Sequence, residues 1–324
     1  MSSAICTLFE GNYHYGLAAL TNSLSKHNFK GVIYAGYKGR LPVWSDKAIP
    51  ENNSQLKGAT RLTVSEKISI CFIPLETDYH LTNYKPDFML NLFAGPCSDC
   101  SSLFYFDPDI VVKQNWTQFE SWALAGVALC EDINSPLPRN HPRRIGWRTF
   151  YNKVQIELEF KEVFYANGGF IGINKADISF LLAWQKLQEA MGMAIGGLNR
   201  SSLPGHIATA LDARIEQHDY FSKTDQDALN ATIEASDTVC SFIGKESMEF
   251  KHGQSMMSHA LGSPKPWRKS FIREALKGNP PSRPDKAYWS FAGAPIITYS
   301  GIQLFIKKNS LSLASIIGRF YSRS

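Results

Sequence analysis

Short apolar runs alternate with helical periodicity along the first third of the chain. Residues 4–9 form an apolar run that ends at a turn-forming cluster, and leucines recur at spacings of three and four between residues 17 and 24. That spacing is the period of an amphipathic helix. Further apolar runs occupy residues 31–37 and 68–73. This order of strands and helices predicts an α/β fold with a mainly parallel central sheet flanked by helices.

The middle of the chain continues the pattern less regularly. Residues 103–106 are four bulky apolar side chains in a row, which is typical of a strand buried on both faces. Residues 131–147 are rich in Pro, Asn and Arg and are expected to form a long loop, and residues 164–174 a strand interrupted by two glycines. A surface excursion is expected over 196–205, and a helix from residue 224 onward.

Composition and charge narrow the class of protein. The chain has 324 residues, of which 44% are hydrophobic and 19% charged, as in an ordinary folded protein with a sizeable core. No apolar run reaches the roughly 18 residues that span a bilayer, and the first residues are expected to form a strand rather than a signal peptide. The net charge of +5 is mild, whereas nucleic-acid binders usually carry a denser basic stripe. We therefore expect a cytoplasmic protein that does not bind nucleic acid.

The cysteines fit a reducing compartment. Cys6, Cys71 and Cys130 lie inside apolar runs, where a free thiol behaves as a small hydrophobic group. Cys97 and Cys100 form a single CxxC in a loop rich in Gly, Pro and Ser. A structural zinc site needs four ligands, and no second pair stands at a suitable spacing. These two thiols are either incidental to the loop or have a redox or metal role.

Two aspartates follow the buried run at 103–106. Asp107 and Asp109 stand one residue apart where ligands of α/β sheets bind, beyond the carboxyl end of a strand. Paired carboxylates suit a hard divalent cation, although the same pattern also caps helices and forms turns. A second pair, Asp225 and Asp227, falls in the first turn of a predicted helix, where the helix dipole alone favours acids.

A longer motif stands near the C-terminus. His259, Gly262, Lys265, Pro266 and Trp267 give the spacing His-x-x-Gly-x-x-Lys-Pro-Trp. This resembles the C-terminal motif of the retaining family 8 glycosyltransferases, which include glycogenin and bacterial lipopolysaccharide galactosyltransferases. The resemblance implies a GT-A type nucleotide-diphospho-sugar transferase fold. It also implies that His259 completes the metal site of the two aspartates, while Gly262 and Lys265 hold the donor diphosphate.

The first strand and the loop after it also match that family. Thr7 and Leu8, followed by Asn12, Tyr13 and Gly16, resemble the segment that cradles the nucleoside. A tyrosine there could stack on the base, since aromatic faces stack on nucleobases. The alternative is that Tyr13 is an ordinary surface aromatic residue.

Two further short segments resemble residues of the family that lie near the transferred sugar. Lys85 resembles a donor-contacting lysine in the helix that precedes the metal strand. Asp225 and Gln226 resemble an Asp-Gln pair set close to the anomeric carbon, and the string continues to Asn230. Asp225 would there stabilise positive charge, although it could also serve only the helix dipole.

The remaining matches contain departures from the family pattern. Asn167, Gly168 and Gly169 resemble an Asn-Ser-Gly or Asn-Ala-Gly turn beside the sugar, with glycine in place of the Ser or Ala. Pro108, counted with the donor-binding positions, occupies the middle of the Asp-x-Asp, where a small residue is usual. Proline changes the shape of the loop without removing a ligand. Both departures affect the choice of donor sugar more than the class of reaction.

The reaction implied is transfer of a hexose, glucose or galactose, from a UDP-sugar to a glycan or lipid-linked acceptor with retention of configuration. Two carboxylates and an imidazole favour Mn²⁺, with Mg²⁺ as the alternative. A sugar-1-phosphate nucleotidyltransferase would need a Gly-rich phosphate loop that the first strand lacks. The remaining alternative is a catalytically degenerate protein that binds a nucleotide sugar or a glycan.

Two basic segments remain. The first comprises Arg139, His141, Arg143, Arg144 and Arg148, and is either a solvated loop or a lid or site for an acidic acceptor. The second is a tail over 301–324 that follows a catalytic domain over 1–300 and combines apolar residues with Lys and Arg but no acids. Such a tail can lie on an anionic membrane surface, here the inner face, or pack as a helix on the domain.

Overall fold

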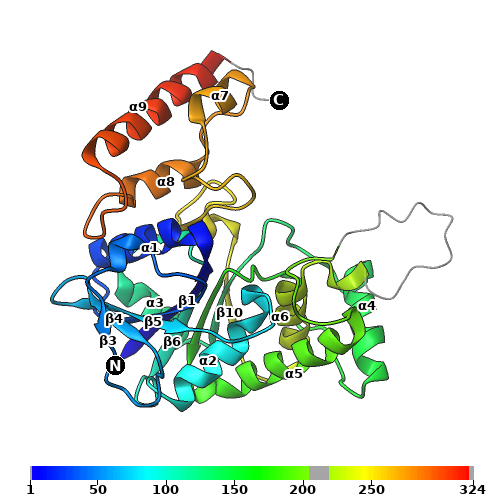
Figure 1. The fold of residues 1–324 in the computed structure, drawn as a ribbon. Coiled ribbons are helices and arrows are strands. Elements are labelled where there is room, and N and C mark those ends of the chain that lie inside the picture. Colours follow the sequence, from blue (N-terminus) through cyan, green and yellow to red (C-terminus); the bar gives the residue numbers. More distant parts are fainter. Residues whose placement is uncertain (1, 204–218, 321–324) are drawn as a thin grey trace.

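The computed structural model describes residues 2–203 and 219–320 and is built around a nine-stranded sheet (Figure 1). The strand order is β10-β8-β9-β6-β1-β2-β5-β4-β3. The strands are β1 (Ser3–Glu10), β2 (Gly31–Lys38), β3 (Ile49–Pro50), β4 (Thr60–Thr63), β5 (Ile68–Pro74), β6 (Ser102–Phe106), β8 (Val127–Cys130), β9 (Phe170–Asn174) and β10 (Cys240–Ile243).

Most of the sheet is parallel. β1 pairs in parallel with β2 and β6, β2 with β5, and β8 with β10. β9 is antiparallel to both β6 and β8, and β3 and β4 form an antiparallel edge beside β5. The expected mainly parallel α/β fold is confirmed, and the strands predicted from the apolar runs are all present.

Helices cover both faces of the sheet. Successive strand residues point to opposite sides, so each strand contributes apolar side chains to two separate cores. In β1, Cys6 and Leu8 belong to the core shared with α2, α4, α5 and α6, whereas Ile5 and Phe9 belong to the core shared with α1 and α3. The helices are α1 (His14–Lys26), α2 (Lys85–Ala94), α3 (Trp116–Ala123), α4 (Pro142–Lys153), α5 (Ile178–Ile195) and α6 (Thr224–Ala235).

Two local expectations were wrong. The segment 131–147 is not a loop throughout, because α4 begins at Pro142 after His141, whose ring accepts a hydrogen bond from the Arg143 N–H. The expected strand 164–174 begins only at Phe170, since the preceding residues turn and Ala166 makes one isolated bridge to Glu131. The expected excursion over 196–205 ends outside the described residues.

A group of three helices follows the sheet, and lies beyond α1 in Figure 1. They are α7 (Phe271–Leu276), α8 (Arg283–Phe291) and α9 (Gly301–Ile317), which share a core built on Trp289 and Ala314. Asn22 of α1 fastens this group: its side chain donates to the Phe291 and Ile296 carbonyls and accepts from the Ile296 N–H.

The expected tail coincides with α9 for most of its length, and residues 321–324 lie outside the described part of the chain. Packing of α9 on α7 and α8 agrees with the helical alternative. Across residues 2–203 and 219–320, every helix is too short or too polar to traverse a lipid bilayer.

Candidate active site

A small two-stranded ribbon assembles the predicted metal ligands. β6 ends at Phe106, the chain turns through Asp107 and Asp109, and β7 (Ile110–Val112) then pairs antiparallel with β11 (Met257–His259). His259 is opposite Ile110 in this register, and so lies beside Asp109. One ligand atom each from Asp107, Asp109 and His259 lie within 4.8 Å of one another. Asp109 and His259 are 150 residues apart in sequence, and this strand pair brings them together with Asp107.

Asp109 is the most tightly held of the three. His259 Nε2 lies 3.4 Å from Asp109 Oδ1, and Lys265 Nζ contacts the other carboxylate oxygen and donates to the Ala260 carbonyl at 2.8 Å. Burial opposes ionisation, but His259 and Lys265 nevertheless hold the pKa of Asp109 far below its ordinary value. The carboxylate is therefore ionised and able to accept a cation. Two carboxylates and one imidazole are a donor set that fits a divalent transition metal.

A buried lysine joins the group of Asp107, Asp109 and His259 to the second Asp-x-Asp. Lys85, the first residue of α2, is 1% exposed. Its Nζ donates to the Gly168 carbonyl at 2.7 Å and to Asp225 Oδ2 at 2.8 Å, and lies 3.2 Å from Asp107 Oδ1. Burial disfavours the charge, but Asp107 and Asp225 more than compensate and raise the pKa of Lys85. The lysine is charged and fixes both carboxylates.

The Asn167 turn lies between these two groups. The Asn167 side-chain amide donates to Asp132 Oδ2 at 2.7 Å, and its oxygen accepts from the Gly169 N–H at 2.9 Å. The Gly168 N–H donates to the side-chain oxygen of Gln226 at 3.0 Å. The other end of that amide, Gln226 Nε2, is buried beside Tyr165.

Two glycines permit the close approach of these segments. A Cβ on Gly169 would lie 2.5 Å from His259 Cε1 and 3.1 Å from Asp107 Oδ2. A Cβ on Gly16 of α1 would lie 2.3 Å from the Pro108 carbonyl oxygen. Real side chains do not approach so closely. Because Gly169 and Gly16 have no side chain, the turn and α1 can lie against the Asp107–Asp109 segment and His259.

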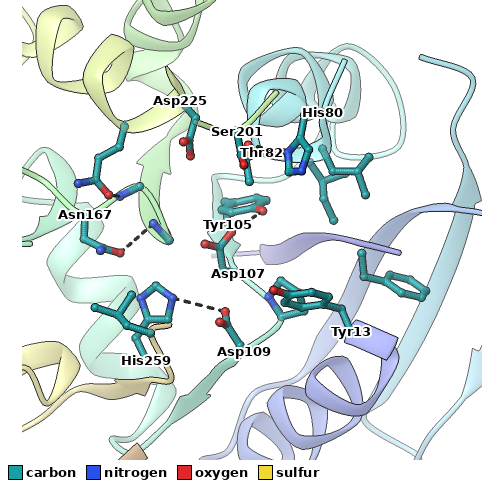
Figure 2. Close-up of a pocket in the computed structure, with 18 of the residues that line it drawn as sticks. Tyr13, His80, Thr82, Tyr105, Asp107, Asp109, Asn167, Ser201, Asp225 and His259 are labelled. Carbon is teal, nitrogen blue, oxygen red and sulfur yellow. Dashed lines mark hydrogen bonds and ion pairs between the residues drawn. The ribbon is translucent and has the colours of Figure 1, made fainter. Parts of the chain in front are cut away.

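These side chains surround a cavity of about 360 Å³ (Figure 2). Tyr13, Asp107 and Asp109 lie across the opening from Asn167 and Asp225. Twelve of the residues singled out in the sequence line this cavity. They are Leu8, Tyr13, Asp107, Pro108, Asp109, Asn167, Gly168, Gly169, Asp225, Gln226, His259 and Lys265.

Four predicted residues do not line the cavity. Thr7 is fully buried, and its hydroxyl has no hydrogen-bond partner among the described residues. Asn12 and Gly262 are exposed, and Lys85 lies beneath the wall. Tyr13 is 37% exposed and packs edge-on against Trp267, with Lys265 Nζ 5.8 Å from its ring centre.

Several residues of the site were not anticipated from the sequence. Asp132 follows β8 as Asp107 follows β6, and that position beyond a strand end was the available signal. His80 was detectable only as a cap, since its ring accepts from the Thr82 N–H in the turn before α2. The other unanticipated lining residues are Phe9, Glu10, Leu81, Thr82, Tyr105, Ser201, Lys223 and Leu261.

The arginine cluster is largely structural, which corrects the expectation of a solvated loop. Arg144 is 2% exposed, pairs with Glu234 at 2.5 Å and donates to the Leu137 and Phe164 carbonyls. Arg148 lies 3.3 Å from the same carboxylate. Both arginines attach α4 to α6.

Comparison with known proteins gives similarity at the level of the fold. The sequence matches no protein-family model and no curated protein. The solved structure of galactosyltransferase LgtC, in complex with donor and acceptor sugar analogues, is 16% identical with a TM-score of 0.51, over 94% of this chain and 99% of that one.

Two other solved structures match with a TM-score of 0.50. Glycosyltransferase GlyE from Streptococcus pneumoniae TIGR4 is 15% identical over 96% of this chain, and the bifunctional glycosyltransferase WbbM is 12% identical over 94%. This chain spans 64% and 51% of the lengths of those two proteins. The chain has the fold of these glycosyltransferases, which confirms the GT-A type fold expected from the resemblance.

Proposed function

We propose that the protein is a glycosyltransferase that moves a hexose, glucose or galactose, from a UDP-sugar to a glycan or lipid-linked acceptor with retention of configuration. The observation that carries the proposal is the convergence of Asp107, Asp109 and His259 in one cavity. Two charged lysines adjoin them, Lys265 in the cavity wall and Lys85 buried beneath it. The cavity lies at the carboxyl ends of β1 and β6, where α/β folds bind their ligands.

The residues near Tyr13 are assigned to the nucleoside and diphosphate. Tyr13 is exposed and lines the cavity, so its ring is accessible for base stacking. Lys265, one of the two charged lysines, would exchange part of its contact with Asp109 for a phosphate oxygen. Asp107, Asp109 and His259 would hold Mn²⁺, which when bound supplies Lewis-acid stabilisation of the leaving diphosphate.

The residues on the opposite wall are assigned to the sugar. Lys85 fixes Asp225 so that its carboxylate faces the cavity, where it can hydrogen-bond the sugar and stabilise positive charge at the anomeric carbon. The side chain of Gln226 lines the cavity beside Asp225 and holds the Gly168 N–H at its wall. Asn167, held by Asp132, keeps the glycine turn in place beneath both.

Turnover separates this proposal from a catalytically degenerate binder. Release of UDP from UDP-glucose and UDP-galactose is measured with Mn²⁺ or EDTA, for the wild type and Asp109→Asn. Metal-dependent release that the substitution abolishes supports transfer. Metal-dependent binding without release from any donor, with or without glycan acceptors, would instead establish the degenerate binder.

The outer face of α9 supports contact with a membrane surface, which would suit a lipid-linked acceptor. Its exposed apolar side chains fall within one helical stripe, and Lys308 and Arg319 flank one side. An apolar stripe with basic neighbours can bind anionic lipid. The stripe comprises Ile302, Phe305, Ile306, Leu313 and Ile316 of α9, and it continues to Phe320 in the short 3-10 helix after it, η7 (Gly318–Phe320).

Vesicle co-sedimentation tests this contact directly. We expect the wild type to sediment with phosphatidylglycerol vesicles and Phe305→Glu to remain in the supernatant. Val43→Glu, which changes an exposed apolar side chain away from α9, is the matched control and should sediment as the wild type does. Equal sedimentation of Phe305→Glu and the wild type would exclude α9 as the contact.

A further inference from the structure

The CxxC lies in the turn that joins α2 to β6, at the opposite end of the sheet from the cavity. α2 ends at Ala94 and β6 begins at Ser102. The Cys97 N–H donates to the Leu92 carbonyl at 2.8 Å, which holds this cysteine against the end of α2. The Cys100 N–H donates to the Cys97 carbonyl at 3.0 Å. Residues 97–100 therefore form a hydrogen-bonded turn.

That turn brings the two cysteines within reach of a disulfide. The first and fourth α-carbons of such a turn lie less than about 7 Å apart. Disulfides span α-carbons roughly 4.4–6.8 Å apart. The side chains of Cys97 and Cys100 are close enough for each to shift the pKa of the other. Little movement of the backbone is needed to join them.

The two thiols differ in the way that a reactive pair requires. Cys97 is fully buried, whereas Cys100 is half-buried and borders a surface hollow also lined by Ser2 and Lys30. The neighbouring Cys97 side chain, with help from Lys175, lowers the pKa of Cys100 to about 7. Burial instead raises the pKa of Cys240, which is also half-buried, to about 12. Thiolate character and access together make a thiol reactive.

We propose that Cys97 and Cys100 are a thiol–disulfide pair, oxidised by low-molecular-weight disulfides such as glutathione disulfide and reduced again by thiols. The Cys100 thiolate attacks one sulfur of glutathione disulfide, forms a mixed disulfide and releases one glutathione thiolate. Cys97 then attacks Cys100 Sγ, which forms the intramolecular bond, and the second glutathione leaves with the proton of Cys97. Two protein thiols are oxidised and one glutathione disulfide is reduced.

The bond would connect two elements that also meet in the cavity. Lys85 begins α2 and Asp107 follows β6, and the CxxC joins the far ends of the same two elements. Oxidation closes a short loop of the chain, so we expect it to raise the unfolding temperature by a few degrees. This inference does not depend on the proposed glycosyl transfer, since neither thiol lines that cavity.

The test uses the intact protein and glutathione disulfide at pH 8. After alkylation, mass spectrometry of the wild type should show the loss of two free thiols, a Cys97–Cys100 linked peptide and full reversal by dithiothreitol. Cys97→Ser should stop at a mixed disulfide on Cys100. Cys240→Ser is the matched control and should form the same bond as the wild type.

Two results would overturn the proposal. Retention of all six free thiols in the wild type would show that Cys100 is not reactive. A persistent mixed disulfide on Cys100 in the wild type would show that Cys97 does not resolve it. Both readings come from the wild type, so they stand even if a variant folds poorly.

Discussion

The replacement Gly169→Ala tests the geometry of the metal cluster without removing any ligand. Its new methyl carbon would lie 2.5 Å from His259 Cε1 and 2.9 Å from Asn167 Oδ1. Carbon atoms in contact prefer about 3.5–4.0 Å, so the imidazole must move by about 1 Å. Metal–ligand distances tolerate only about 0.2 Å, and a 1 Å misplacement at a reacting centre typically costs about 100-fold in rate.

We therefore expect Gly169→Ala to weaken Mn²⁺ binding by about 10- to 100-fold. Overpacking of the buried turn should also lower the free energy of unfolding by about 1–3 kcal/mol. Electron paramagnetic resonance of free Mn²⁺ gives the affinity, and urea unfolding gives the stability. Both are measured at a temperature where the variant is folded.

Gly293→Ala is the matched control, because its Cβ would meet nothing within 4 Å and its backbone is not left-handed. It should bind Mn²⁺ as the wild type does. If folded Gly169→Ala also bound Mn²⁺ with wild-type affinity, His259 would not be a ligand in the arrangement described, and the reasoning from this contact would fail.

Three further substitutions probe other parts of the structure. Lys85→Met leaves Asp107 and Asp225 without their buried cation. Urea unfolding at neutral pH should therefore show a free energy of unfolding lower by about 3–5 kcal/mol, and an unchanged value would refute the role of Lys85. Burial, outweighing Arg143, raises the pKa of Asp227 to about 7, above its unfolded value of about 3.9. Between these two pKa values the folded protein holds a proton that the unfolded chain has lost, so its stability falls as pH rises from about 4 to 7. The urea midpoint should depend less on pH in Asp227→Asn than in the wild type, and an equal dependence would contradict this. Asn22→Ala leaves backbone groups of Phe291 and Ile296 unpaired, and each should lower the free energy of unfolding by about 1–3 kcal/mol. Limited proteolysis should cut the connection between α8 and α9 faster than in the wild type.

The elements that were predicted correctly from the sequence have their predictive pattern within their own residues. The strand ending before Asp107 is five consecutive buried residues, and the leucines of α1 repeat on one helical face. The cavity residues were reached through motif spacing, and the β7–β11 pairing explains why positions so far apart belong to one cluster. These short strands of three residues each had no periodicity that could have predicted them.

The failures concern residues whose partners are remote in the chain. Helix α4 buries few side chains and is strongly polar, so its sequence resembled a loop. Arg144 was placed in a segment expected to be either a solvated loop or a lid or acceptor site, yet Glu234 meets it from α6, 90 residues away. Asp132 likewise acts through Asn167, 35 residues further on. Only the packed structure brings such pairs together.

The measurement closest to the central claim is thermal unfolding of the wild type and Asp109→Asn with UDP, GDP and CMP sugars, in Mn²⁺ or EDTA. The account predicts that one UDP-sugar raises the unfolding temperature only with Mn²⁺, and that Asp109→Asn loses this rise while folding normally in the absence of ligand. No metal-dependent rise with any donor would contradict the assignment of the cavity to a nucleotide sugar.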